Sequence, residues 1–257
     1  MTLVDTHAHL QDRRLADDLD AILGRARDAG VSRVVAIGTT AEDSAEVVAI
    51  AHRYDHVYAA VGIQPNHVAE AAEGDFGRVV ALAADPRVKA IGETGLDRYW
   101  DRTPFDLQQD YFGRHLRLAR ERGLPVVIHC RECEADIVEQ LDAFGPPVSG
   151  VLHSFTGNVA QAAAFLQLGL HISMAGMVTF PSKVGDALRE AARSIPADRL
   201  LVETDSPYLS PHPFRGKTNE PARVALTAAY LAELRGEPLE RLAAATTANA
   251  RRLFDLP

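Results

Sequence analysis

Cysteine is scarce in this chain, with two among 257 residues. Two cysteines cannot supply the disulfide framework that is typical of small secreted proteins. Long apolar runs are absent as well, since none approaches the roughly 20 residues that a membrane-spanning helix needs. Met1 leads directly into TLVDTHAHL, which does not resemble a secretory signal peptide. We therefore expect a cytoplasmic protein with no membrane partner.

Positive charge is in deficit. There are 27 Lys and Arg residues against 35 Asp and Glu residues, which gives a formal net charge of -8. This balance argues against a protein that coats nucleic acid through a broad basic surface. It does not exclude an enzyme that binds phosphate at one site, because bound divalent cations are often the largest charges in a site and make it locally positive.

Linkers, charge blocks and low-complexity stretches are also missing, so nothing in the sequence divides the chain. Hydrophobic residues make up 47% and charged residues 24%, which is ordinary for a globular protein. The length suffices for a sizeable core. We interpret residues 1–257 as a single domain.

Short apolar and β-branched runs recur about every thirty residues, the spacing of a strand-plus-helix unit. They are mainly apolar rather than strictly alternating, which indicates strands buried on both faces of a parallel sheet. Eight such strands are predicted: Leu3–Thr6, Val31–Ile37, Val57–Val61, Val88–Ile91, Pro125–Ile128, Gly150–Leu152, Leu170–Ser173 and Leu200–Val202.

Segments with helical periodicity separate these strands. LADDLDAILGRARDAG (15–30) has one apolar stripe and ends at Gly30, and PFDLQQDYFGRHLRLARERG (104–123) ends at Gly123. Eight strand–helix units in this length predict a (β/α)₈ TIM barrel. The alternative is a doubly wound open sheet, which the lack of a Gly-x-Gly-x-x-Gly motif after the first strand disfavours.

Imidazole and carboxylate groups directly follow five of the eight strands. In a barrel the carboxyl ends of the strands share one rim, so these groups are expected to converge there. Ionisable groups are costly to bury unless they are paired or bind metal, and a cluster of this composition indicates a metal site. The residues are His7 and His9, Glu93, His129, His153, and Glu203 with Asp205.

This ligand set is too large for one tetrahedral ion. It suits two divalent ions about 3.5–4 Å apart that share a carboxylate and activate a water. A carboxylate from a middle strand faces both ions, so Glu93 is the predicted bridge.

Six motifs in this order resemble the TatD family of metal-dependent deoxyribonucleases, within the amidohydrolase superfamily: DTHAHL, GETGLDRYW, PVVIHCRE, LHSFTGN, ETDSPYL and RGKTNEP. The resemblance covers nearly the whole chain and implies the same barrel fold. It implies that His7, His9 and Asp205 hold one ion, that His129 and His153 hold the other, and that Glu93 bridges them. It also implies that Asp205 acts as general base, with Glu203 either binding metal or supporting the ligands.

One position departs from the family pattern. Members commonly carry Gly-x-His-Pro after the third strand, whereas this chain has GIQPNH, with Gln64 at the His position and His67 three residues on. Gln64 and His67 are candidate substrate contacts. Arg131 and Arg215 are two more, because they lie in loops that would form a local basic rim together with Arg98 and Lys217.

Other features have more than one interpretation. Cys130 and Cys133 have redox-like C-x-x-C spacing, although we favour a pair of adjacent thiols without redox function. Tyr99 and Trp100 either pack against the barrel or stack on bases. Ser154 adjoins His153 but points to the opposite face of a strand, which disfavours a serine nucleophile. Solvated or packed roles are expected for His52, His56, His115, His171 and His212.

These observations predict a hydrolase that cleaves phosphodiester bonds in DNA, trimming single strands from the 3′ end as a monomer or weak homo-oligomer. The substrate rests on the family resemblance. Mg²⁺, Mn²⁺ and Zn²⁺ all remain candidates. One alternative is an esterase or amidase with the same site, for example an aminoacyl-tRNA deacylase. Another is a protein-binding scaffold with an idle metal site.

Overall fold

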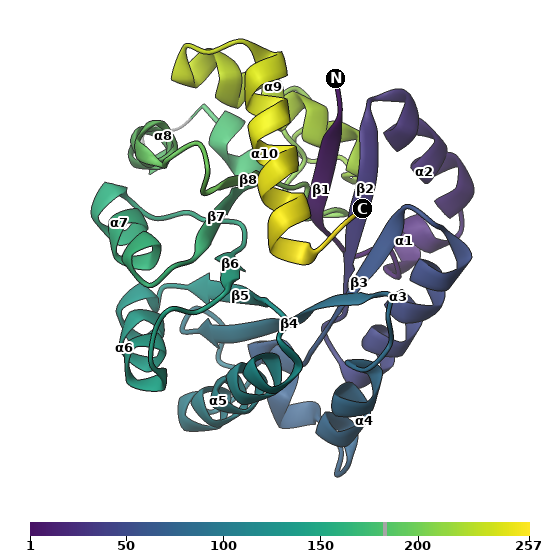
Figure 1. Cartoon of the computed structure of the whole chain (residues 1–257), viewed down its shortest axis with the longest axis vertical. Helices are drawn as coiled ribbons and strands as arrows, with labels where there is room; N and C mark the ends of the chain where they lie inside the picture. Colours follow the sequence, from purple (N-terminus) through teal and green to yellow (C-terminus); the bar gives the residue numbers. More distant parts are fainter. Residues whose placement is uncertain (182–183) are drawn as a thin grey trace.

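Eight parallel strands form one sheet in the order β1 to β8 (Figure 1). The computed structural model describes residues 1–181 and 184–257. The sheet curves round until β1 meets the segment after β8, where Ala8 pairs with Ser206 and the Asp205 N–H donates to the His7 carbonyl at 2.9 Å. The strands are β1 Leu3–Ala8, β2 Val31–Ile37, β3 Val57–Val61, β4 Val88–Asp97, β5 Val126–Arg131, β6 Gly150–Leu152, β7 His171–Met174 and β8 Leu200–Val202.

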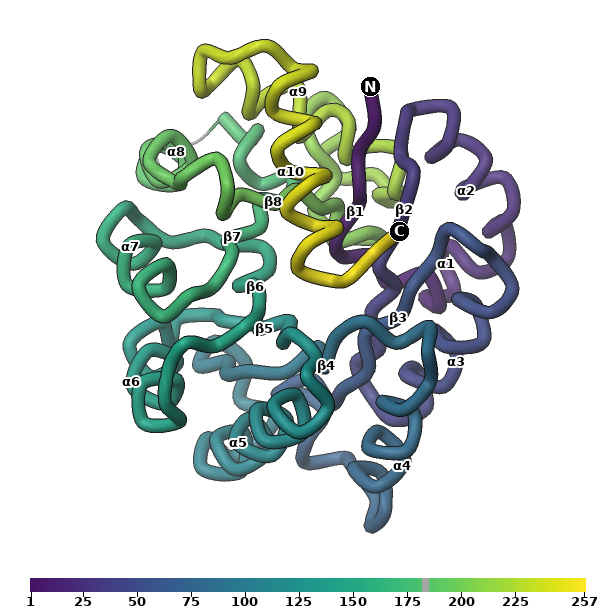
Figure 2. The backbone as a smooth tube through the Cα atoms, in the orientation of Figure 1, coloured from purple at the N-terminus to yellow at the C-terminus, as the bar shows by residue number. Residues whose placement is uncertain are grey.

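Helices connect successive strands and surround the sheet, as the backbone trace in Figure 2 shows. They are α1 Arg13–Ala16, α2 Leu19–Asp28, α3 Ala41–Arg53, α4 Asp75–Leu82, α5 Phe105–Arg122, α6 Glu134–Phe144, α7 Val159–Gln167, α8 Val184–Ser194, α9 Val224–Arg235 and α10 Leu239–Phe254. Three short 3₁₀ helices complete the chain: η1 Pro65–Glu70, η2 Gly176–Thr179 and η3 Pro221–Arg223. Among the described residues, no helix is long and apolar enough to cross a membrane.

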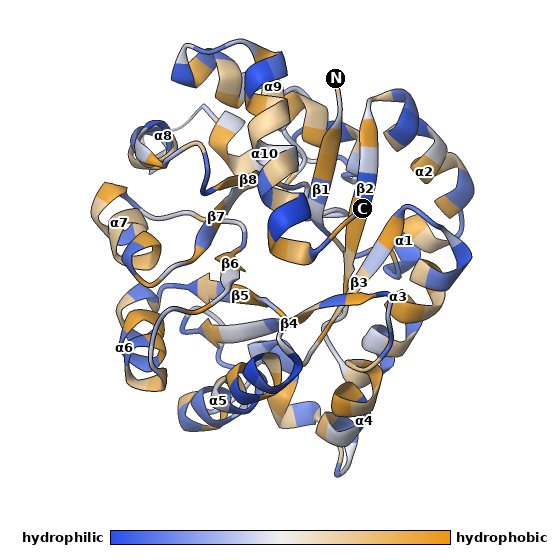
Figure 3. Ribbon diagram, in the orientation of Figure 1, coloured by the Kyte–Doolittle hydropathy of each residue, from blue (hydrophilic) through white to orange (hydrophobic). Residues whose placement is uncertain are grey.

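The hydrophobic core has two parts. The larger lies between the sheet and the helices, whose apolar faces turn toward the strands (Figure 3). The smaller fills the barrel interior, where Val35, Tyr58 and Val127 cluster with Leu253 and Phe254 of α10.

Helix α10 closes the end of the barrel at which the strands begin. Thr247 Oγ1 donates to the carbonyl of Thr2, just before β1, at 2.8 Å. Asn249 Nδ2 donates to the carbonyl of Leu200, the first residue of β8, at 2.9 Å. The opposite end, where the strands finish, is left for the functional loops.

The predicted barrel is confirmed, and every predicted strand is found within a few residues of its expected bounds. Strand β4 differs most, because it continues past Ile91 to Asp97 and pairs with β5 through Gly95 and His129. Gly95 permits this extension. Its φ is +135°, and an added Cβ would lie 2.1 Å from the carbonyl oxygen of His129.

The helix predicted from Leu15 to Gly30 is in fact two helices. Helix α1 ends at Ala16, and α2 begins at Leu19 and ends at Asp28. The Asp12 side chain accepts a hydrogen bond from Arg14 N and so caps the N-terminus of α1. The apolar stripe was nevertheless read correctly, because Leu15, Leu19, Ile22, Leu23 and Ala26 are all buried.

Candidate metal centre

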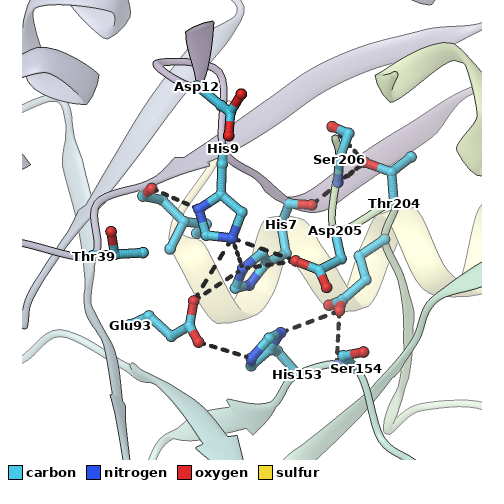
Figure 4. A network of polar contacts seen from close by, with 12 residues as sticks. His7, His9, Asp12, Thr39, Glu93, His153, Ser154, Thr204, Asp205 and Ser206 are labelled. Carbon is cyan, nitrogen blue, oxygen red and sulfur yellow. Dashed lines mark hydrogen bonds and ion pairs between the residues drawn. The ribbon is translucent and has the colours of Figure 1, made fainter. Parts of the chain in front are cut away.

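Seven histidine and carboxylate side chains meet at the carboxyl ends of five strands. Each was expected at this rim, and the structure brings all seven together. Figure 4 labels five of them: His7, His9, Glu93, His153 and Asp205. Three subsets have ligand atoms close enough to hold an ion: His7 with His9 and Glu93; Glu93 with His129 and His153; and His7 with His153 and Glu203.

Glu93 lies between two pairs of histidines. Its Oε2 atom is 3.4 Å from His7 Nε2 and 3.8 Å from His9 Nε2. Its Oε1 atom is 2.9 Å from His129 Nδ1 and 3.3 Å from His153 Nε2. One carboxylate therefore presents a separate oxygen to each pair, as a bridging ligand does.

Asp205 faces the first pair of histidines. Its Oδ1 atom is 3.4 Å from His9 Nε2 and 3.6 Å from His7 Nε2. The residue has a φ of +55°, and its N–H donates to the His7 carbonyl. Asp residues adopt this left-handed conformation more readily than most, and here it turns the carboxylate into the centre.

Glu203 does not face the same pair of histidines as Asp205. Strand β8 ends at Val202, so the alternation of side chains stops before Glu203. The carboxylate is buried behind His153, with Oε1 3.4 Å from His153 Nδ1 and accepting from Ser154 N at 2.7 Å. Glu203 thus contacts the far side of a predicted ligand.

Sequence reasoning missed Asp97. This residue contacts His129 from behind, as Glu203 contacts His153. Its buried Oδ2 atom accepts from His129 Nε2 and from Asn66 Nδ2, each at 2.9 Å. The contact fixes the ring so that Nδ1 points at Glu93. The signal was present, because Asp97 follows Glu93 by four residues and shares its strand face.

Asp5 was missed as well. It is fully buried in β1, where Oδ1 accepts from Thr204 N at 2.8 Å and Oδ2 accepts from Thr204 Oγ1 at 2.6 Å. Burial raises the pKa of this carboxyl to about 8, against the opposing effect of these hydrogen bonds. Asp5 joins β1 to the segment that carries Asp205.

The electrostatics of the centre are those of a cation site. Burial alone would lower the pKa of His129, but hydrogen bonds to Asp97 and Glu93 raise it to about 9. Burial would raise the pKa of Glu93, yet the surrounding histidines hold it well below its usual range. Glu93 is therefore charged at neutral pH and favours positive charge at the centre.

The donor set fits divalent metal. His7 Nε2 and His9 Nε2 are 3.2 Å apart, and His153 Nε2 and His129 Nδ1 are 3.5 Å apart. Ring nitrogens this close repel through their lone pairs unless a proton or a cation lies between them. Imidazole and carboxylate together suit Zn²⁺, Mn²⁺ and Fe²⁺.

The four predicted substrate contacts are spread around the rim. Gln64 is buried, and its Oε1 accepts from Asn66 N at 2.8 Å, which caps η1. His67 lies on η1, with Nδ1 3.5 Å from Glu70. Arg131 is exposed at the end of β5, and Arg215 is exposed in the loop after β8.

The remaining polar residues do not join the centre. Cys130 and Cys133 are free thiols with sulfurs 3.8 Å apart. His115 is fully buried in α5, accepts from Ile63 N at 3.0 Å, and fills a packed role as expected. Exposed His52 pairs with Asp85 at 2.8 Å.

A (β/α)₈ barrel with a histidine–carboxylate centre at the carboxyl ends of its strands defines the class of metal-dependent hydrolases. The family model of TatD-related DNases matches residues 4–255. The chain belongs to this family.

Relatives of known sequence agree. The chain is 40% identical to an uncharacterized metal-dependent hydrolase, YabD, of Bacillus subtilis, over 98% of each protein. It is 36% identical to a protein of Erwinia tasmaniensis named 3′-5′ ssDNA/RNA exonuclease TatD, over 99% of this chain and 100% of that protein. The crystal structure of YjjV, a TatD homologue from Escherichia coli, superposes with a TM-score of 0.93 at 34% identity, covering 99% of this chain and 98% of that one.

Proposed function

We propose that this protein is a two-metal phosphodiesterase that removes nucleotides from the 3′ end of single-stranded DNA. The observation that carries the proposal is the position of Glu93, whose two oxygens face two separate pairs of histidines. In this proposal His7, His9 and Asp205 hold one ion, His129 and His153 hold the other, and Glu93 bridges them.

Divalent metal held by these residues would lower the pKa of a bound water and would polarise the phosphate under attack. The Asp205 carboxylate accepts the proton of the attacking water. Burial would raise the pKa of Asp205, but the neighbouring His9 and His7 lower it, so the group is an unprotonated acceptor at neutral pH. Glu203 and Asp97 orient His153 and His129 from behind.

An aromatic pair beside the centre supports a substrate with bases. Tyr99 and Trp100 are 49% and 43% exposed, and the Arg131 guanidinium stacks 3.7 Å from the centre of the Tyr99 ring. Their backbone N–H groups both donate to Asp97 Oδ1. Exposed aromatic and Arg side chains stack on unpaired bases, and here the carboxylate that orients His129 also fixes the loop that carries them.

The relative named as a 3′-5′ ssDNA/RNA exonuclease supports removal of nucleotides from the 3′ end and a single-stranded substrate. Gln64 and His67 remain proposed contacts for the strand, with Arg131 and Arg215. Gln64 can donate to a phosphate, but unlike His it adds no charge.

The test uses protein stripped of metal and then supplied separately with Mg²⁺, Mn²⁺ or Zn²⁺. Each sample receives a 5′-labelled single-stranded DNA, with an RNA of the same sequence in parallel. Glu93→Ala is run alongside, and Glu46→Ala, which removes an exposed carboxylate on α3, is the matched control.

We expect a metal-dependent ladder that shortens from the 3′ end with the original protein and with Glu46→Ala, and an intact strand with Glu93→Ala. An intact oligonucleotide with every ion contradicts nuclease action. A panel of small esters, amides and aminoacyl-tRNA then identifies the alternative hydrolase, and metal binding without turnover on any of them indicates an idle site. Full activity of Glu93→Ala contradicts the bridging role.

A further inference from the structure

A cavity of about 350 Å³ opens beside the metal centre, between the loop after β1 and the segment after β8. Tyr208 joins the two sites. Its N–H donates to the Asp205 carbonyl at 2.8 Å, and its ring centre lies 6.0 Å from that of His9, edge to face. The cavity is lined by Arg14, Phe180, Tyr208, Ser210, Arg215 and Lys217, among others.

The Tyr208 ring is fixed in place from one side. The Arg14 guanidinium stacks 4.5 Å from the ring centre. Arg14 is itself held by Asp12, through Nε to Oδ1 at 2.9 Å and Nη2 to Oδ2 at 2.7 Å. Tyr208 is nevertheless 48% exposed, which leaves a large part of the ring open to a ligand.

Arg215 and Lys217 supply uncompensated positive charge. Both side chains are exposed, and within residues 1–181 and 184–257 neither cation forms an ion pair with a carboxylate. Arg215 packs instead on Phe180, 4.7 Å from its ring centre. Two such charges in one cavity of a chain with net charge -8 mark a site for an anion.

We propose that this cavity binds one nucleotide of the strand, with its phosphate between Arg215 and Lys217 and its base against Tyr208. The inference rests on the proposed nuclease function and adds the place at which the terminal nucleotide is recognised. A volume of about 350 Å³ lies at the lower end of the range for small-molecule sites. The cavity therefore suits a single nucleotide, which agrees with removal of one residue at a time from a strand end.

The test is calorimetric titration of the metal-loaded protein with thymidine 5′-monophosphate and, separately, with inorganic phosphate. Arg215→Gln and Lys217→Gln each remove one charge from the cavity. Arg122→Gln removes an exposed charge at the other end of the barrel, where its guanidinium donates to the Val80 carbonyl, and is the matched control. Tyr208→Ala removes the proposed base contact.

We expect Arg215→Gln and Lys217→Gln each to lower the affinity for thymidine monophosphate about tenfold, the value of one charge-assisted hydrogen bond. Arg122→Gln should bind the nucleotide with the affinity of the original protein. Tyr208→Ala should weaken thymidine monophosphate and leave the affinity for inorganic phosphate unchanged. If Tyr208→Ala loses affinity equally for thymidine monophosphate and for inorganic phosphate, the cavity binds phosphate only and its assignment to a nucleotide is wrong.

Nuclease assays and nucleotide titrations together distinguish an error in the cavity assignment from an error in the nuclease proposal. If the protein shortens DNA but does not bind the nucleotide, or binds it equally well in all charge variants, the cavity assignment is wrong and the nuclease proposal stands. If the protein cuts no oligonucleotide but the cavity variants still lose the nucleotide, the nuclease proposal is wrong and the cavity assignment stands.

Discussion

Asp205 differs from the other carboxylates of the centre in how many roles it combines. Its side chain faces His7 and His9, its N–H closes the barrel onto the His7 carbonyl, and its carbonyl accepts from Tyr208. Metal binding and proton transfer are therefore assigned to the same side chain. A substitution that keeps its shape separates the two roles.

Asp205→Asn should lower kcat by about 10²–10⁴, the usual contribution of a general base, while metal content falls much less. An amide oxygen still coordinates metal but cannot take a proton from water at neutral pH. Metal analysis and single-turnover rates on the same samples provide the comparison. An unchanged rate would rule out proton transfer by Asp205.

Asp97 acts through His129 rather than on the substrate. Asp97→Asn should weaken binding of the ion at His129 about 10–100-fold, because it weakens the hydrogen bond that orients the ring. Competition titration with a chelator measures this affinity. Asn66→Ala, which deletes another donor to the same carboxylate, is the control and should have a smaller effect. Equal losses in the two variants would indicate a general loosening of the loop.

At the scale of elements, helix α5 carries a histidine that the chemistry does not use. His115 Nδ1 donates to the Tyr111 carbonyl at 2.7 Å, and its Nε2 accepts from Ile63 N. This pattern requires a neutral ring with one proton. Burial lowers the pKa of His115 to about 4.

Stability should consequently fall as pH is lowered from 6.5 toward 4. In that range the unfolded chain binds a proton at His115 that the folded chain does not, so acid favours unfolding by up to about 3 kcal/mol. Urea unfolding at several pH values should show a shallower pH dependence for His115→Gln. His171, whose pKa burial also lowers to about 4, retains part of the effect. Leu118→Ala, a buried change in the same helix, should lower stability but keep the pH dependence of the original protein. If His115→Gln also keeps that pH dependence, His115 is not the group responsible.

At the scale of the whole molecule, metal binding and folding should be linked, because the predicted ligands come from strands spread between His7 and Asp205 and meet only in the folded barrel. An ion that binds only the folded state stabilises it by about 4 kcal/mol at a thousand times its dissociation constant. Metal-loaded protein should therefore unfold at a higher temperature than protein in chelator. In Glu93→Gln, metal should raise the unfolding temperature much less. If metal raises it as much as in the original protein, metal binding does not require Glu93.

The sequence predicted the barrel well because each strand contains a mainly apolar run, and the predicted ligands follow such runs. His7, Glu93 and His153 could be found by that rule alone. It could not find the partners of Asp5, since Thr204 lies 199 positions away and the two meet only when β1 and the segment after β8 close the barrel. It left two roles open for Glu203, metal ligand or support for a ligand, because its contact with His153 joins residues 50 positions apart in the sequence.

Helix α10 has a consequence for how material passes through this molecule. Because Leu253 and Phe254 of α10 pack inside the barrel at the end where the strands begin, we expect the centre to be reached from the opposite end. If the proposed nuclease function holds, we expect the strand end to enter and the cleaved nucleotide to leave on that same side. The departing fragment and the incoming end thus compete for the same entrance, and accumulated product should slow the next turnover.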